Sequence, residues 1–244
     1  MLKSITSKTN PLIKEAFAYK KEAGEHFLIE GFHSVEMALM ANLVDELFLL
    51  KEYPNCPLPQ YLVTPEIIDK LAFTRNPEGI VALCHKPLKR PFDGTRLLYL
   101  ERVQDPGNLG TLLRTALAFG FHDVLVSKDG CSPYNPKALL ASQGALFSLN
   151  VQLSLTSSSE DIEALKAQGY FILGTALKEA SAFESFHCPE GKLALLLGNE
   201  GQGLDEKVLA LCDAKIKISM AGIDSLNVGV AGGILMYAFG NSGL

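Results

Sequence analysis

Clustered cysteines and long apolar runs are both missing from the sequence. Five cysteines are spread over 244 residues, and none forms a C-x-x-C pair: Cys56, Cys84, Cys131, Cys188 and Cys212. Neither a metal site nor a disulfide framework is therefore predicted, and reduced thiols favour a cytoplasmic protein. No stretch reaches the roughly 18 consecutive apolar residues that span a bilayer, and the first residues lack the apolar segment of a signal peptide. We expect neither secretion nor a membrane partner.

The sequence also has no excess of basic residues. Its 22 Lys and Arg residues against 27 Asp and Glu residues give a net charge of −5, which argues against broad binding of polyanions such as DNA. The basic residues are unevenly spread, because five lysines accompany a single acidic residue, Glu15, within the first 21 positions: Lys3, Lys8, Lys14, Lys20 and Lys21. Such a patch is typical either of a phosphate-binding surface or of a solvated helix face. The pattern leaves both interpretations open.

The composition is that of a packed globular protein in two parts. Hydrophobic residues make up 48% and charged residues 20%, which argues against extended disorder, and the length suits two domains. The clearest break is HKPLKRPFDGT, residues 85–95, where two prolines and a glycine interrupt two apolar strands. We place the domain boundary there, which predicts one domain over residues 1–90 and a second over 91–244.

Both parts alternate between the periods of strands and helices, which predicts an α/β fold throughout. In the first part FLIEG, VDELFLL, YLV and GIVALC read as strands, and HSVEMALMAN and PEIIDKLAF as helices. In the second part RLLYLERV, DVLVSK, YFILGTAL, KLALLLG and AKIKISM are longer apolar strands separated by helical patterns. Strands of this kind are buried on both faces, so we expect a mostly parallel sheet.

The first of three polar segments at the strand ends is Glu101–Gly120. A strand ends in the turn formed by residues 105–107, and Asn108 is expected to cap the helix that follows. Arg114 is unusual, because it stands among leucines and alanines of that helix. A guanidinium in such surroundings needs a path to water or an anionic partner, and an ordinary ion pair would satisfy it as well as a ligand.

The second segment, Leu193–Cys212, is a strand followed by a glycine-rich loop at Gly198–Gly203 and a helix that opens near Asp205. Glycines let backbone amides approach a ligand closely. The order is G-x-x-G-x-G and not the dinucleotide fingerprint G-x-G-x-x-G, which argues against a nicotinamide-linked dehydrogenase. A tight turn without a ligand is the alternative.

The third segment, Ile216–Gly240, is a strand that passes through a short loop into a helix, for which Ser225 is the expected cap. Gly229, Gly232 and Gly233 lie within that helix. Each glycine there costs about 1 kcal/mol relative to alanine, so three of them predict that another part of the backbone packs very close.

Together these segments resemble a known family. DPGNLGTLLRTALAFG (105–120), LLLGNEGQGL (195–204) and ISMAGIDSLNVGVAGGI (218–234) are similar, in order and separation, to the three signature motifs of the SpoU (TrmH) branch of the SPOUT RNA methyltransferases. ALLASQGALFSLNV (138–151) is similar to the S-x-G-A segment that lies between the first two motifs. The N-terminal stretch resembles the substrate-binding domain of the ribosomal-RNA members, so the resemblance spans nearly the whole chain.

The resemblance implies methyl transfer from S-adenosylmethionine to a ribose 2′-OH of RNA. The additional N-terminal domain favours ribosomal RNA over transfer RNA. The implied fold is a C-terminal SPOUT α/β domain tied in a deep trefoil knot, which periodicity alone would not predict, behind a small α/β RNA-binding domain. A homodimer is implied as well. The alternatives are a tRNA ribose methyltransferase and a catalytically silent RNA-binding or ribosome-assembly protein with the same knotted fold.

The resemblance also implies roles for individual residues. The catalytic residues are those of the motifs: Asn108, Arg114, Glu200, Ser225 and Asn227. Backbone loops matching residues 173–176, 198–203 and 218–226 hold the cofactor, and the cofactor-binding residues are Thr175, Gly198, Ile218, Met220 and Leu226. RNA contacts are expected at Lys8, Lys14 and Arg90. Because a guanidinium keeps its proton at almost any pH, we expect Arg114 to bind phosphate and stabilise a developing alkoxide rather than to act as a base.

The third motif departs from the family at one position. It usually reads I-P-M, whereas this chain has Ile218, Ser219 and Met220. Serine loses the fixed φ of proline and adds a backbone donor, which predicts weaker binding of the cofactor.

Overall fold

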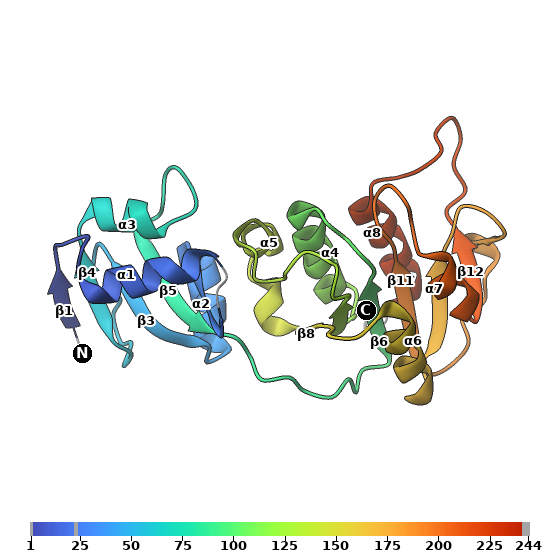
Figure 1. Cartoon of the computed structure of the whole chain (residues 1–244), viewed down its shortest axis with the longest axis horizontal. Helices are drawn as coiled ribbons and strands as arrows, with labels where there is room; N and C mark the ends of the chain where they lie inside the picture. The colour runs from blue at the N-terminus through green and yellow to red at the C-terminus, as the bar shows by residue number, and fades with distance from the viewer. Residues whose placement is uncertain (1, 22–23, 241–244) are drawn as a thin grey trace.

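The computed structural model describes residues 2–21 and 24–240, which form two β-sheets beside each other along the longest axis of the molecule (Figure 1). Sheet A has the order β1-β4-β3-β5-β2, and its strands are β1 (Leu2–Ile5), β2 (His26–Glu30), β3 (Val44–Leu49), β4 (Gln60–Val63) and β5 (Ile80–His85). It is a mixed sheet, because β3 and β1 pair parallel with β4 while β5 pairs antiparallel with β2 and β3.

Helices cover both faces of sheet A. The helices α1 (Pro11–Ala18) and α3 (Pro65–Leu71) share one apolar core with one face of the sheet, and α2 (Phe32–Met40) belongs to the core on the other face. A short 3₁₀ turn, η1 (Tyr19–Lys21), follows α1. The start of α1 is fixed by Asn10, whose side chain accepts the amide hydrogen of Leu12, and by Pro11 at the first helical position.

Sheet B has the order β10-β12-β9-β11-β6-β7-β8, and every pair of neighbouring strands is parallel. Its strands are β6 (Arg96–Leu100), β7 (Asp123–Val126), β8 (Asn150–Leu153), β9 (Phe171–Thr175), β10 (Ser181–Ala182), β11 (Leu193–Leu197) and β12 (Ala214–Lys217). The predicted mostly parallel sheet is thus confirmed. Its central strand β11 is buried along its whole length, as the unbroken apolar run LALLL requires.

The helices of sheet B are divided between its two faces. One face packs against α4 (Pro106–Ala118), α5 (Pro136–Ser142), η2 (Ala145–Ser148) and α8 (Val228–Phe239), and the other against α6 (Ser158–Ala167) and α7 (Glu206–Leu211); a 3₁₀ turn, η3 (Phe183–Ser185), follows β10. Alternate residues of one strand pack against opposite helix layers. Leu98 of β6 lies in the core with α4, α5 and α8, and Tyr99 lies in the core with α6 and α7.

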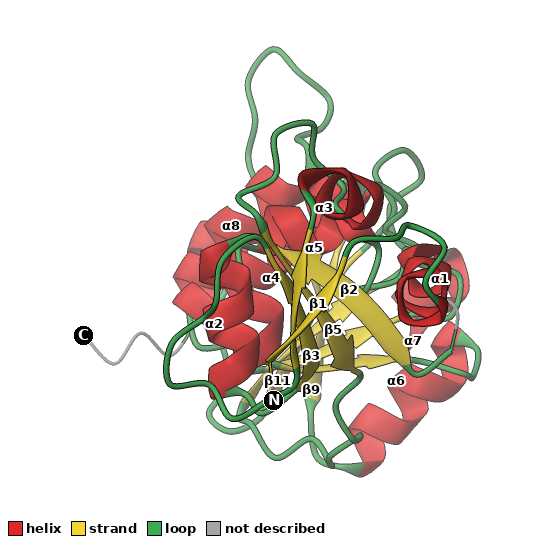
Figure 2. Ribbon diagram, turned by 90° about the vertical axis from the view of Figure 1, so that its left-hand side faces the viewer, coloured by secondary structure: helices red, strands yellow, loops and turns green. Residues whose placement is uncertain are grey.

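The apolar core of the α4 layer continues into sheet A. Phe27 of β2 places its ring 4.9 Å from the ring of Tyr134 and 6.3 Å from that of Phe147, both of which belong to sheet B's half of the chain. Gly144 leaves room for Met37 of α2, since a Cβ at this glycine would lie 2.9 Å from the Met37 side chain. Figure 2 shows the result, with α2, α4 and α8 on one side of the strands and α1, α6 and α7 on the other.

The segment between β5 and β6 runs outside this interface, along the bottom of Figure 1 beneath β8. It has no helix or strand of its own. The carbonyl oxygen of Arg90 accepts hydrogen bonds from the side-chain amides of Asn150 and Gln152 on β8. The segment is therefore fastened to the outer strand of sheet B, and the Arg90 side chain is left exposed.

Two helix caps and one packing prediction from the sequence are wrong. Asp105, not Asn108, caps α4, because its carboxylate accepts the amide hydrogen of Asn108 at 2.8 Å. Asn227, not Ser225, caps α8. The close neighbours of the α8 glycines are side chains and not another backbone, since a Cβ at Gly232 would lie 2.3 Å from Cδ2 of Leu112.

In the described ranges no helix is long and apolar enough to cross a membrane. Nowhere in the same residues do three or more His, Cys, Asp or Glu side chains lie together so that they could bind one metal ion.

Candidate active site

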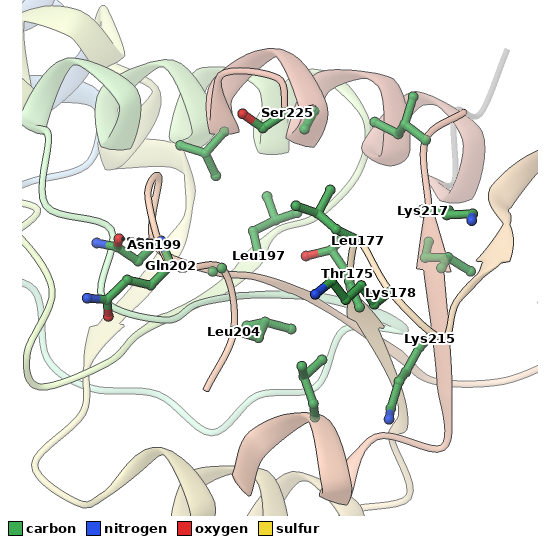
Figure 3. Close-up of a pocket in the computed structure, with 18 of the residues that line it drawn as sticks. Thr175, Leu177, Lys178, Leu197, Asn199, Gln202, Leu204, Lys215, Lys217 and Ser225 are labelled. Atoms are coloured by element: carbon green, nitrogen blue, oxygen red, sulfur yellow. Dashed lines mark hydrogen bonds between the residues drawn. The ribbon is translucent and has the colours of Figure 1, made fainter. Parts of the chain in front are cut away.

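A cavity of about 710 Å³ opens at the carboxyl ends of β9, β11 and β12, beside the first turns of α8 (Figure 3). Its middle is apolar, with Leu197 and Leu204 there, while Asn199 and Gln202 lie on one side and Lys215 on the other. The carboxyl ends of parallel strands are where open α/β sheets bind their ligands. The cavity is therefore the leading candidate for the site.

The residues that the sequence assigned to cofactor binding all line this cavity: Thr175, Gly198, Ile218, Met220 and Leu226. Glu200 and Ser225, two of the predicted catalytic residues, line it as well. Three segments that are far apart in the chain thus meet around one space. What these residues bind stays a prediction.

The loop from Gly198 to Gly203 is folded back on itself. Asn199 and Gly203 exchange two backbone hydrogen bonds of 3.1 and 2.9 Å. A Cβ at Gly198 would lie 2.2 Å from the carbonyl carbon of Gly203, so only glycine allows the two ends of the loop to approach this closely.

Asn199 holds this loop in place, a role that the sequence did not suggest. Its Oδ1 accepts the amide hydrogens of Gly201 and Gln202, and its Nδ2 donates to the carbonyl oxygen of Arg102 at 2.9 Å. The last bond joins the loop to the end of β6. The available signal was a local one, because asparagine is a preferred turn residue that bonds to the backbone two residues on.

Three predicted catalytic residues form a continuous chain of hydrogen bonds across the motifs. Nδ2 of Asn227 donates to Oδ1 of Asn108 at 2.9 Å, and Nδ2 of Asn108 donates to Oε1 of Glu200 at 3.1 Å. The Glu200 carboxylate also accepts the amide hydrogens of Gln104 and Asp105, at 3.5 and 3.3 Å. The starts of α4 and α8 are thereby tied to the Gly198–Gly203 loop.

The direction of this chain follows from what each group can donate. Oδ1 of Asn227 accepts the amide hydrogens of Gly229 and Val230 at the start of α8, which leaves its Nδ2 to donate to Asn108. Glu200 offers only acceptors when ionised, so the Nδ2 of Asn108 must point toward it. Both amide orientations are thus determined by their neighbours.

A buried carboxylate supports the loop from below. Glu101 is 1% exposed, and its Oε2 accepts the amide hydrogen of Asp205, the cap of α7, at 2.8 Å. Burial raises the pKa of the Glu101 carboxyl above its ordinary value. The hydrogen bond from the Asp205 amide and the charge of Arg102 act in the opposite direction and only reduce this rise. Glu101 therefore fixes the point at which the loop enters α7.

The remaining predicted residues lie away from the cavity. Arg114 is on the exposed side of α4, and no hydrogen bond or ion pair joins it to the described part of the chain. Lys8 and Lys14 are exposed around the start of α1, and Arg90 lies in the segment between the sheets. The structure therefore brings Asn108, Glu200 and Asn227 together, with Ser225 on the cavity wall, and leaves the four basic residues outside.

Comparison with known proteins identifies the family. The model of the SpoU rRNA Methylase family matches residues 95–237. The chain is 33% identical over 247 residues to the 23S rRNA (guanosine(2553)-2'-O)-methyltransferase RlmP of Bacillus subtilis (strain 168), covering 97% of this chain and 98% of the relative. It is also similar to the AdoMet-bound rRNA methyltransferase from Sinorhizobium meliloti, with a TM-score of 0.87 and 25% identity over 97% of this chain and 96% of the other.

A structure described as giving insights into 2-OH methylation of C/U34 on tRNA matches less of the chain. It is 30% identical with a TM-score of 0.51, and the match covers 59% of this chain and 92% of that one. The first three comparisons extend over the motifs that surround the cavity, and two of them extend over both sheets. The chain therefore belongs to the SpoU rRNA methylase family and is an RNA methyltransferase.

Proposed function

We propose that the chain transfers the methyl group of S-adenosylmethionine to a ribose 2′-OH of RNA. The single observation that carries this proposal is the series of side-chain hydrogen bonds from Asn227 through Asn108 to Glu200 at the rim of the cavity. It ties together the parts of the site contributed by all three motifs. Alignment of reacting groups is the main need of a displacement at a methyl carbon.

The cavity fits this cofactor. Its volume of about 710 Å³ lies within the range of pockets that enclose a small molecule. Leu197, Leu204 and Leu235 supply an apolar wall suited to a nucleobase, and Glu200 supplies a carboxylate suited to a positively charged sulfonium. The residues that would hold the cofactor are Thr175, Gly198, Ile218, Met220 and Leu226. When bound, S-adenosylmethionine supplies an electrophilic methyl group.

The chain's own groups would then orient the acceptor. Glu200 accepts hydrogen bonds from both the Asn108 side chain and the backbone before α4, so its carboxylate is fixed at the cavity edge. Ser225 lies on the cavity wall and is exposed to an incoming ribose. Arg114 is proposed to bind an RNA phosphate and to stabilise the alkoxide that develops as the hydroxyl loses its proton to water.

Ribosomal RNA is the proposed substrate. The Bacillus subtilis and Sinorhizobium meliloti proteins, both matched over 97% of the chain, are named rRNA methyltransferases, whereas the tRNA methylation structure covers 59% of the chain. We propose residues 1–90 as the RNA-binding domain and 91–244 as the catalytic domain. Lys8, Lys14 and Arg90 are exposed, as phosphate contacts must be.

A homodimer and a C-terminal trefoil knot complete the proposal. The outer side of α8 exposes two large apolar side chains, Val230 at 53% and Tyr237 at 69%, and it lies beside the outer side of α4 that carries Arg114. A second copy covering this surface would bury the apolar residues. It would also bring Arg114 of one subunit toward the site of the other.

The dimer proposal predicts complementation between inactive subunits. Arg114→Ala and Glu200→Ala are each expected to be inactive, and mixing them after separation of the subunits should restore up to a quarter of the activity. Sedimentation of the wild type should give twice the mass of the chain. A monomer, or a mixture that stays inactive, would contradict the proposal.

The function as a whole is tested by mapping ribose methylation in rRNA from cells with and without the gene. Loss of one 2′-O-methyl mark, restored by the wild type and not by Glu200→Ala, is the expected result. Calorimetry with S-adenosylmethionine tests the cofactor separately. Binding of RNA without any cofactor binding would favour the catalytically silent alternative, and a mark lost from tRNA would favour the tRNA alternative.

A further inference from the structure

Arg102 occupies the position in sheet B where a ligand would be expected, although none of the sequence motifs drew attention to it. It follows β6, which lies between β11 and β7. The chain continues from β6 to β7 and β8 on one side, and then crosses to build β9, β11 and β12 on the other. Ligands of open α/β sheets bind in the crevice at such a reversal of strand order.

The backbone of Arg102 has a conformation that side chains seldom adopt. Its φ is +53°, in the left-handed region that favours glycine. Two tertiary hydrogen bonds impose this conformation, one from its amide to Oγ of Ser127 at 2.8 Å and one from Nδ2 of Asn199 to its carbonyl oxygen at 2.9 Å. A strained residue held from both sides is a recognised sign of a functional position.

The guanidinium of Arg102 is poorly matched within the chain. Its Nε is buried without a hydrogen-bond partner among residues 2–21 and 24–240. The nearest carboxylate oxygen, Oε1 of Glu101, is 3.9 Å from Nε, and Nη1 reaches Oε1 of Gln202 only at 3.5 Å. Its side chain is 28% exposed. A planar group with five donors is therefore partly open to an external acceptor.

The place of this guanidinium indicates which acceptor it meets. Gln202 follows Glu200 in the loop by two residues and lines the cofactor cavity, and the amide of Gln104 contacts Glu200. Arg102 thus stands next to the group proposed to orient the ribose. An RNA chain entering here brings one phosphate per nucleotide past Glu200. A guanidinium beside that carboxylate can bind such a phosphate through its paired N–H donors.

We propose that Arg102 binds a phosphate of the RNA substrate adjoining the methylated ribose. The proposal rests on the proposed function, since it requires RNA at the cavity mouth. Glu101 forms an ion pair with Arg102 but leaves its Nε without a hydrogen bond, because Oε2 of Glu101 is engaged by the Asp205 amide and Oε1 is 3.9 Å from Nε. Arg102 therefore acts on the substrate, whereas Asn199 and Glu101 act on the loop.

The test measures the salt dependence of RNA binding by the full chain. The probe is an unmodified 23S rRNA transcript, titrated between about 50 and about 300 mM KCl. Arg102→Gln is expected to weaken binding about tenfold at low salt and to lower the slope of log K against log salt by about 0.7, the loss of one phosphate contact. Arg102→Lys keeps the charge and should keep the slope while losing part of the affinity. Lys166→Gln, at an exposed position in the last turn of α6 and away from the cavity, is the matched control, because it lies outside the proposed RNA-binding domain.

Calorimetry with S-adenosylmethionine separates a structural role from an RNA contact. Both Arg102 variants should bind the cofactor as the wild type does. A normal salt slope in Arg102→Gln, or a loss of cofactor affinity equal to the loss of RNA affinity, would overturn the assignment of Arg102 and leave the proposed function intact. A wild type that does not bind the transcript would overturn both.

Discussion

The side-chain amide of Asn108 must donate toward Glu200 and accept from Asn227. Its Nδ2 donates to Glu200 while its Oδ1 accepts from Asn227. Asn108→Asp replaces that donor with an acceptor and places a second carboxylate beside Glu200, so the loops that carry the two residues should separate. A misplacement of about 1 Å near the chemistry costs about 100-fold in rate. We expect a loss of kcat of that order, measured by transfer of labelled methyl to rRNA.

Asn42→Asp is the matched control for this substitution. Asn42 is exposed with φ +57°, a conformation that aspartate tolerates. The substitution changes the charge of the protein by the same amount as Asn108→Asp. Because Asn42 takes no part in the hydrogen bonds between Asn227, Asn108 and Glu200, the activity should be unchanged. Equal losses in the two variants would mean that the charge of the protein, and not the hydrogen-bond chain, determines the rate.

The buried carboxyl of Glu101 should make the free energy of unfolding depend on pH. Burial raises its pKa in the folded chain, so the folded state binds a proton more tightly than the unfolded state. The resulting stabilisation is full below the ordinary carboxyl pKa and is lost as the pH rises through the raised value. Glu101→Gln keeps an acceptor for Asp205 and removes the ionisation. Its free energy of unfolding should exceed that of the wild type by on the order of 1 kcal/mol at pH 8, with a smaller gain at pH 5, measured by urea denaturation.

Glu160→Gln should behave in the opposite way. Its carboxylate accepts hydrogen bonds from the side chain and backbone of Ser157, which lower the pKa of Glu160. The stabilisation is therefore present at neutral pH and lost as the pH falls through the depressed value. This variant should be less stable than the wild type at pH 8. The same direction of change in both variants would contradict the two pKa assignments.

At the scale of elements, α8 contains two adjacent glycines with different surroundings. A Cβ at Gly232 would lie 2.3 Å from Cδ2 of Leu112 and 2.8 Å from Cδ1 of Leu197, whereas one at Gly233 meets only Cγ2 of Thr115 at 3.9 Å. Gly232→Ala should push α8 away from α4 and β11 and destabilise the chain by about 1 to 3 kcal/mol. Gly233→Ala should stabilise the helix by up to about 1 kcal/mol.

Thermal unfolding of the two alanine variants measures this difference. Because both substitutions add one methyl group to the same helix, helix propensity cancels in the comparison. Similar melting temperatures would show that the side chains of Leu112 and Leu197 move aside without cost. The pair therefore measures how tightly α8 is packed beside the cavity.

The sequence predicted those elements whose pattern is strong within a few residues. The apolar runs of β6, β7, β9, β11 and β12 were enough for a parallel sheet, since such strands are buried on both faces. The strands β1, β8 and β10 were missed because LKSI, NVQL and SA carry no apolar run, and pairing with a neighbour determines their conformation. The two wrong caps arose where several capping residues stand close together, such as Asp105 and Asn108.

The candidate site was predictable as a set of segments but not as a set of contacts. Resemblance supplied the site residues, and all five predicted cofactor residues line the cavity, together with Glu200 and Ser225. The roles of Asn199, Glu101 and Arg102 depend on bonds between residues about a hundred positions apart, as from Asn199 to Arg102. No local pattern contains that information.

At the scale of the whole molecule, the two sheets share one apolar core. Phe27 of sheet A is buried against Tyr134 and Phe147, and the core around it extends to Leu195 of β11. A core that crosses from one sheet to the other couples their unfolding. The connecting segment, fastened to β8 through Arg90, adds a second attachment.

Phe27→Ala tests this coupling. Removing the ring leaves a cavity between the sheets and should lower the free energy of unfolding by about 3 to 5 kcal/mol. If the core is shared, hydrogen exchange of the β11 amides should accelerate together with that of β2, because both open in the same cooperative step. Phe32→Ala is the control, since Phe32 is 44% exposed at the start of α2 and should change stability by less than about 1 kcal/mol. Faster exchange confined to sheet A would mean that the sheets unfold separately and that their shared core carries little of the stability of the cavity.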